Sequence, residues 1–335
     1  MNALTFPILR ILTDGKFHSG EDIARQLKVS RATVWNALQD AGKLGIEIFS
    51  VRGRGYKLPQ AVTLLDEQAV LNAIGEQRAW FKLEIHNHLE STNTYMMKKL
   101  SSGQAHASCI AANLQTNGRG RRGRSWQAGL GVSLTFSLLW RFQCGASALS
   151  GLSLAVGVAL IRALHSFGIH QAQLKWPNDV LIVDKNQHRE KLAGILIELQ
   201  GDMEGPSAAV IGIGINLNLP TKIKQRIDQP ATDLASALNL ANVSAQTINP
   251  NELLGVLLKH LADVLSIFEQ QGFTSIRDEW TKHHAYHLQV VKMLHPDGRE
   301  TVGKVTNVAD DGILLINTAL GEHRFSSGEI SLRSF

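Results

Sequence analysis

The spacing of apolar positions changes twice along the chain, and each change marks an expected domain boundary. In the first 60 residues apolar positions recur every three or four residues, as at Val34, Leu38 and Ala41, which is the spacing of one helix face. The middle of the chain has longer apolar runs that suit buried strands and helices. After residue 286, short alternating runs are separated by Asp-Gly turns, which are typical of hairpins. We therefore expect domains at 1–62, 66–284 and 286–335, the last a small SH3-like β-barrel.

The N-terminal pattern predicts a winged helix-turn-helix. Apolar runs predict helices at 4–12 and 31–43, with another beginning after the capping-box-like Ser19 and Asp22. A strand over 46–51, a basic turn and a returning strand would form the wing. Polar residues on the outer helix face and in the turn can bond phosphates or base edges. These candidate DNA contacts are Ser30, Arg31, Thr33, Asn36, Gln39, Arg52 and Arg54. A helical module that binds protein is the alternative.

Residues 115–126 form a loop of glycines and arginines between the apolar, strand-like runs 107–114 and 132–140. Glycine lets the backbone approach a ligand closely, and arginine grips carboxylate or phosphate with a planar fork. The pattern favours an active-site loop that closes on a polyanion. The alternative is a nucleic-acid arm or an RGG-like tract.

Shorter polar stretches lie at the ends of other apolar runs. Ser91, Thr92 and Asn93 precede a helix, and from spacing alone capping is the favoured role, with contact to a small polar ligand as the alternative. Residues 174–179 form a Pro-containing turn that either presents groups to phosphate and Mg²⁺ or is a plain turn. Lys191 opens a buried strand and is a candidate anion contact. The polar stretch 219–232 is expected to be a second mobile loop.

Several classes of protein are excluded or disfavoured. The Gly-Ile-Gly-Ile-Asn stretch at 212–216 lacks a third glycine and lies within a strand-like run, so it is no dinucleotide fingerprint, and no Walker motif occurs. Cys109 and Cys144 form no CxxC pair, which favours a reducing cytoplasm over a zinc site or a disulfide framework. No apolar run is long enough to span a bilayer, so no membrane partner is expected. The net charge of +5 permits an anionic partner.

Five motifs in this order resemble the biotin protein ligases: Glu-Ser-Thr-Asn (90–93), Gln-Thr-Asn-Gly-Arg-Gly-Arg-Arg-Gly-Arg (115–124), Lys-Trp-Pro-Asn-Asp (175–179), Lys-Leu-Ala-Gly-Ile (191–195) and Gly-Ile-Gly-Ile-Asn (212–216). With the winged helix, the chain resembles the bifunctional bacterial type, which is ligase and biotin operon repressor at once. The resemblance covers nearly the whole chain. It implies an α+β multidomain fold whose centre is a mixed α/β sheet of the biotin/lipoate ligase type.

The resemblance also implies an activity. Biotin and Mg·ATP would give biotinyl-5′-AMP, and biotin would then pass to a lysine of the biotin carboxyl carrier protein of acetyl-CoA carboxylase. The adenylate would also be the corepressor, inducing a homodimer that binds biotin operator DNA. Two rivals remain, namely a lipoate- or octanoate-type ligase and a DNA-binding biotin sensor without ligase activity. The intact arginine loop and Lys191 disfavour both.

The same resemblance assigns residue roles. Biotin contacts would be Ser91, Thr92, Asn93, Gln115, Arg119, Gly120, Arg121 and Lys191. ATP or adenylate contacts would be Arg119, Arg121, Arg124, Trp126, Asn178 and Asn216. Lys191 and Arg121 would be catalytic, and Asp179 would meet Mg²⁺.

Overall fold

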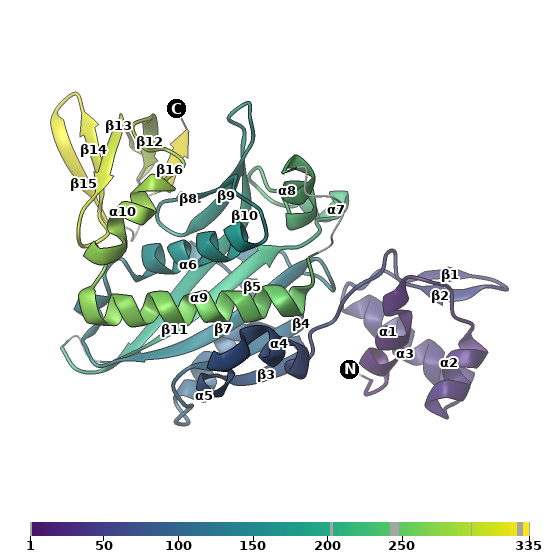
Figure 1. The fold of residues 1–335 in the computed structure, drawn as a ribbon. Coiled ribbons are helices and arrows are strands. Elements are labelled where there is room, and N and C mark those ends of the chain that lie inside the picture. Colours follow the sequence, from purple (N-terminus) through teal and green to yellow (C-terminus); the bar gives the residue numbers. More distant parts are fainter. Residues whose placement is uncertain (1, 202–203, 242–247, 296, 327–330, 335) are drawn as a thin grey trace.

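The chain folds into three bodies that follow one another along the sequence (Figure 1). In this computed structural model the described residues are 2–201, 204–241, 248–295, 297–326 and 331–334. A helical body with a two-stranded wing lies on one side, a seven-stranded sheet covered by helices forms the centre, and a five-stranded sheet lies on the opposite side. This arrangement confirms the predicted fold class.

The N-terminal body is the predicted winged helix-turn-helix. Ser19 and Ser30 cap the second and third helices, accepting bonds from the Asp22 and Thr33 amides at 3.0 and 3.1 Å. The strand expected over 46–51 begins only at Phe49, because the Ile46 amide donates back to the Ala41 carbonyl and continues the helix end instead. The elements are α1 (Thr5–Ile11), α2 (Gly20–Leu27), α3 (Arg31–Lys43), β1 (Phe49–Val51) and β2 (Gly55–Lys57).

The central sheet is mixed, with the strand order β3-β4-β7-β11-β10-β9-β8. β3 and β4 run parallel, whereas the other neighbouring pairs are antiparallel. The strands are β3 (Lys82–Leu89), β4 (Ser108–Gln115), β7 (Ser133–Phe142), β8 (Ala172–Lys175), β9 (Asp179–Val183), β10 (Arg189–Gly201) and β11 (Ser207–Asn216). The arginine loop connects β4 to β7 and pairs with itself as β5 (Gly118–Arg119) and β6 (Ser125–Trp126).

Helices cover the two faces of this sheet unequally. The long helices α6 and α9 pack together with α4 on one face, whereas α5 lies on the other (Figure 1). Their bounds are α4 (Glu67–Ile74), α5 (Thr92–Leu100), α6 (Leu152–Ser166), α7 (Thr221–Lys224), α8 (Leu234–Leu240), α9 (Pro250–Gln271) and α10 (Thr274–Lys282). Both α7 and α8 lie where the pattern predicted no helix, and α7 falls within the stretch expected to be a mobile loop.

Alternation along β11 decides which face carries the site. Ile211 and Ile213 enter the main core with the long helices, whereas Val210 packs against α5 on the opposite face. Because strand side chains alternate, Gly212 and Gly214 lie on the α5 face. This face is only partly covered by α5, which leaves room beside that helix for a cavity.

The C-terminal body is an antiparallel sheet in the order β15-β14-β13-β12-β16. It is joined to the central body by the Trp176 indole, which donates to the Gly312 carbonyl at 3.1 Å, and by Ser150, which donates to the Asp311 carbonyl. The strands are β12 (Val290–Leu294), β13 (Glu300–Val308), β14 (Leu314–Thr318), β15 (Gly321–Phe325) and β16 (Ser331–Ser334). Among the described residues, no helix is both long and apolar enough to cross a membrane.

Candidate active site

A cavity of about 400 Å³ opens on the α5 face of the central sheet, between the arginine loop and the ends of β9, β10 and β11. It gathers every residue for which the sequence predicted a ligand or metal contact in the central domain. These are Ser91, Thr92, Asn93, Gln115, Arg119, Gly120, Arg121, Arg124, Trp126, Asn178, Asp179, Lys191 and Asn216. Segments more than 120 residues apart in the sequence therefore build one site.

Two glycines form the floor of this cavity. A Cβ added to Gly212 would lie 2.0 Å from Asn93 Oδ1, and one added to Gly214 would lie 2.5 Å from Trp126 Cε2. Both distances are far below van der Waals contact, so any larger residue would displace the side chain above it. The Gly-Ile-Gly-Ile-Asn stretch thus lets Asn93 and Trp126 lie flat against β11.

A network of neutral polar groups forms one wall. The Thr92 amide and hydroxyl both donate to Gln115 Oε1, at 2.8 and 3.1 Å, and the Ser137 hydroxyl donates to Asn93 Oδ1 at 2.6 Å. Ser91 accepts from the Thr94 amide at 3.4 Å, so it caps α5 and also lines the cavity. These buried, mutually bonded groups are held in fixed orientations, as recognition of a small polar ligand requires.

Sequence analysis did not select Ser137, which lies in an apolar strand. A polar residue inside such a run was the one available signal, because a buried hydroxyl needs a partner. The sequence pattern did not select Glu198 either, which lies after the buried residues of β10. Its carboxylate contacts two predicted site residues, Asn93 and Arg119.

The opposite end of the cavity is strongly cationic. Lys191 Nζ lies 2.6 Å from Asp179 Oδ1, and the Arg121 guanidinium donates to Asn178 Oδ1 at 3.1 Å. Burial lowers the pKa of Lys175 to about 8 and also lowers the pKa of Arg121, because few water molecules can solvate these charges. Several cations around one carboxylate leave a net positive field that suits a polyanion.

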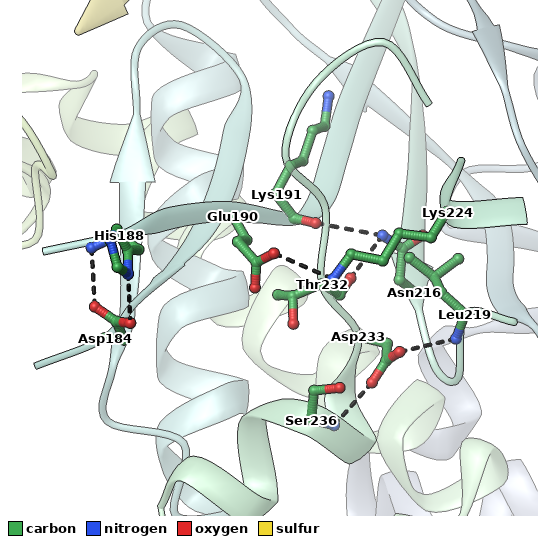
Figure 2. Close-up of polar contacts among 10 residues, drawn as sticks. All are labelled: Asp184, His188, Glu190, Lys191, Asn216, Leu219, Lys224, Thr232, Asp233 and Ser236. Carbon is green, nitrogen blue, oxygen red and sulfur yellow. Dashed lines mark hydrogen bonds and ion pairs between the residues drawn. The ribbon is translucent and has the colours of Figure 1, made fainter. Parts of the chain in front are cut away.

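The backbone at Lys191 is held by the segment that follows β11 (Figure 2). The Lys191 amide donates to the Pro230 carbonyl at 2.9 Å, and the Thr232 amide donates to the Lys191 carbonyl at 3.0 Å. Asn216 Nδ2 donates to the carbonyls of Thr232 and Lys191, at 2.9 and 3.4 Å. The side chain of Lys191 points away from these bonds, so Asn216 supports the strand that carries the lysine (Figure 2).

The C-terminal body also reaches the cavity, because Leu332 and Arg333 of β16 line it. Among the described residues, no group of three or more His, Cys, Asp or Glu side chains is placed to hold a metal ion. A metal at this site would therefore need most of its ligands from a bound molecule or from water.

The predicted DNA contacts lie apart from this cavity, on the N-terminal body. Asn36 and Gln39 are exposed on α3, but the Ser30 hydroxyl is used as the helix cap, and Arg31 pairs with Glu21 at 3.0 Å. In the wing, the Arg54 guanidinium stacks over Phe17, with 4.4 Å between its Cζ and the ring centroid. Arg52 and Thr33 complete the predicted set at the surface, as exposed and half-buried residues respectively.

Comparisons with known proteins agree with this geometry. The Biotin/lipoate A/B protein ligase family matches residues 86–216, an HTH domain matches 5–57, and the Biotin protein ligase C terminal domain matches 289–333. The chain is 32% identical to the Bifunctional ligase/repressor BirA of Salmonella typhimurium, over 100% of this chain and 99% of that protein. It is 32% identical to its Escherichia coli K12 counterpart, over 99% and 98%.

The solved structures point the same way. A biotin protein ligase from Aquifex aeolicus in complex with biotin and ATP superimposes with a TM-score of 0.61 at 28% identity. The superposition covers 76% of this chain and 99% of that one.

Proposed function

Because this chain belongs to the family of bifunctional biotin ligase/repressors, we propose that its central cavity makes biotinyl-5′-AMP from biotin and ATP and that the protein then biotinylates a carrier. The observation that carries this proposal is that a hydrogen-bonded polar wall and a cationic end meet in the same cavity. The wall, with Thr92, Asn93 and Gln115, suits the ureido head of biotin. The cationic end suits its carboxylate and the phosphates of ATP.

The first step joins two anions. A biotin carboxylate oxygen attacks the α-phosphorus of ATP, the bond to the bridging oxygen breaks, and pyrophosphate leaves with that electron pair. Lys191 and Arg121 offset the repulsion and stabilise the charge on the phosphorus oxygens as the step proceeds. The ion pair of Lys191 with Asp179 holds the ammonium group inside the cavity before ligands bind.

The second step moves biotin to the carrier. The ε-amine of a carrier lysine attacks the carbonyl of the mixed anhydride, an amide forms with loss of a proton, and AMP leaves. Because the anhydride is open to attack by water, the arginine loop must cover it until the carrier docks. The acceptor is a biotin carboxyl carrier protein, and we place it in the acetyl-CoA carboxylase of the cytoplasm.

Magnesium enters this scheme with the nucleotide. Mg²⁺ commonly keeps several water molecules and binds substrate phosphates plus one or two carboxylates. Asp179 supplies one carboxylate at the cationic end, which fits such a shared site. When bound, the ion would neutralise phosphate charge, and Asp179 would help to hold it while also pairing with Lys191.

The N-terminal body gives the protein its second role, repression of biotin synthesis genes with biotinyl-5′-AMP as corepressor. Its exposed α3 face and basic wing have the geometry of a DNA reader. A two-fold operator is matched by a two-fold protein, so the DNA-binding form is a homodimer that the adenylate induces.

Mass spectrometry of a biotin carboxyl carrier domain tests the ligase proposal. The carrier is incubated with the protein, biotin and Mg·ATP, and a biotin-sized gain on one lysine is expected. Lys191→Ala should abolish the gain. Lys224→Ala is the matched control, because Lys224 pairs with Glu190 at 3.1 Å outside the cavity, and it should keep the activity. A gain with lipoate alone would assign the chain to the sister ligases, and no gain with either would leave a DNA-binding sensor.

A further inference from the structure

Glu198 places a carboxylate beside the cavity, against two of the residues that line it, Asn93 and Arg119. Its two oxygens lie 2.9 and 3.2 Å from Arg119 Nη2 and Nη1, a two-pronged ion pair. Glu198 Oε2 also accepts from Asn93 Nδ2 at 3.0 Å. A negative charge here opposes binding of a phosphate or carboxylate ligand, so its presence needs a physical reason.

The Glu198 carboxylate connects three parts of the site: the arginine loop, the polar wall and the central sheet. Arg119 ends β5, at the root of the arginine loop, and the same guanidinium also donates to Thr94 on α5. Asn93 lies over Gly212, and its Oδ1 accepts from the hydroxyl of Ser137, the cross-strand neighbour of Gly212. Glu198 extends from the inner strand β10, whose residues 193–201 pair with β11. One carboxylate therefore ties the loop to the rigid sheet and to the polar wall.

We infer that Glu198 is a positioning residue, which holds the Arg119 end of the arginine loop closed over the adenylate. This inference rests on the proposed function and deepens it. It also changes the predicted role of Arg119, whose guanidinium serves the loop closure while Arg121, Arg124, Lys175 and Lys191 face the anionic ligand. Arg–carboxylate pairs of this two-pronged kind are stronger than single contacts, and Glu198 is largely shielded, with 23% of its side chain exposed.

Release of biotinyl-5′-AMP from the full-length protein measures the closure directly. Glu198→Gln keeps the size and the acceptor oxygen for Asn93 but removes the charge that holds Arg119. We expect release to become about tenfold faster, equivalent to about 1.4 kcal/mol, while biotin affinity without nucleotide changes little. Glu300→Gln, which breaks an ion pair of 3.5 Å with Lys292 in the C-terminal sheet, is the control and should leave release unchanged.

A double-mutant cycle separates positioning from a general structural effect. Arg119→Gln breaks the same pair from the more exposed partner, so it also keeps the test valid if Glu198→Gln folds poorly. In the Arg119→Gln background, Glu198→Gln should add nothing to the release rate. Equal acceleration in both backgrounds would overturn the inference, because Glu198 would then act through Asn93 or the sheet.

Two other outcomes would also overturn it. Unchanged release from Glu198→Gln would show that the Arg119–Glu198 pair does not hold the arginine loop closed. Slower release would show that Glu198 competes with the ligand for Arg119. Failure of the proposed function has a different signature: the wild-type protein itself would form no biotinyl-5′-AMP from biotin and Mg·ATP.

Discussion

At the scale of single residues, the shape of the site depends on glycines, which have no side chain, as well as on the polar side chains that line it. Gly214 leaves the space that the Trp126 indole fills, and an alanine there would place its methyl 2.5 Å from the ring. Gly214→Ala should therefore lift Trp126 from the sheet and weaken adenylate binding on the order of tenfold. Overpacking should also cost about 1–3 kcal/mol of stability.

Titration calorimetry with a non-hydrolysable analogue of biotinyl-5′-AMP, together with thermal unfolding, checks this prediction. Gly42→Ala is the matched control, because a Cβ at this helical glycine meets nothing within 4 Å. The control should bind the analogue normally. Normal binding by Gly214→Ala as well would show that Trp126 does not shape the adenylate site.

A second residue-scale prediction concerns the pH dependence of nucleotide binding. Burial lowers the pKa of Lys175 to about 8, so this lysine loses its charge as the pH rises through 8. A bound triphosphate favours the charged lysine and raises its pKa, so binding takes up a proton above pH 8. Affinity for ATP should therefore fall above pH 8, by at most about tenfold per pH unit.

The phosphates themselves ionise near pH 6, so they do not change charge in this window. Calorimetry of Mg·ATP binding between pH 7 and 9.5 gives the slope. Lys175→Met should bind more weakly at pH 7 and show a flatter profile. Lys185→Met, at an exposed turn, should retain the wild-type slope. A wild-type slope in Lys175→Met would assign the titration to another group.

At the scale of elements, sequence patterns located the strands on both sides of the arginine loop, the helix after Asn93 and the strand that Lys191 opens, because apolar periodicity and capping are local properties. Ser19 as a helix cap and the strands around the arginine loop are of this kind. The face on which Glu198 lies, and its contact with Arg119, depend on strand pairing across the sheet. Alternation within one strand cannot reveal such contacts, since the partners are 79 residues apart.

Spacing alone cannot distinguish a helix cap from a residue that lines a cavity. For residues 91–93 spacing favours a cap, and Ser91 does cap α5, yet all three residues also line the cavity. The missed helix α8 begins at Leu234, directly after Asp233, which caps it by accepting from the Ser236 amide at 2.8 Å. Its seven residues are too few for apolar periodicity to distinguish a helix from a loop.

Two substitutions in the winged helix-turn-helix test whether the wing and α3 have different roles in DNA binding. Arg54 on the wing is suited to phosphate, whereas Asn36 on α3 is suited to a base edge. Arg54→Gln should weaken binding to operator and random DNA alike and should lower the salt slope by about 1. Asn36→Ala should cost about 1–3 kcal/mol on the operator only.

Fluorescence anisotropy with operator and scrambled duplexes across a salt series distinguishes the two effects. Lys304→Gln, an exposed position in the C-terminal sheet, is the control and should change neither quantity. If Asn36→Ala weakened both duplexes equally, α3 would contact only the backbone, and sequence would be read elsewhere.

At the scale of the whole molecule, the segment that follows β11, residues 218–229, contacts the DNA-binding body and also lines the cavity. Asn218 donates to Gln60 at 3.0 Å, and Lys222 pairs with Glu47 at 3.3 Å, which joins this segment to the linker and to the N-terminal body. Residues 226–229 of the same segment line the cavity. A ligand that changes the position of this segment therefore acts on the N-terminal body as well.

Such a connection predicts a coupling that is equal in both directions. Biotinyl-5′-AMP should raise operator affinity by some factor, and operator DNA should raise adenylate affinity by the same factor, because both describe one thermodynamic cycle. Anisotropy with and without adenylate, and calorimetry with and without operator, measure the two factors. AMP alone is the control ligand and should have little effect.

The protein concentration then tells how the coupling is transmitted. If the adenylate acts by inducing the dimer, the gain in operator affinity that it causes should depend on protein concentration. The gain should grow as the concentration falls toward the dissociation constant of the ligand-free dimer, because less dimer then forms without the adenylate. Transmission through Lys222 and Glu47 alone would be independent of concentration and small, since exposed ion pairs contribute about 0–1 kcal/mol. Lys222→Gln should accordingly change the factor by less than about fivefold. Equal operator affinity with and without adenylate would contradict the coupling itself and leave a ligase whose DNA-binding body is independent of its product.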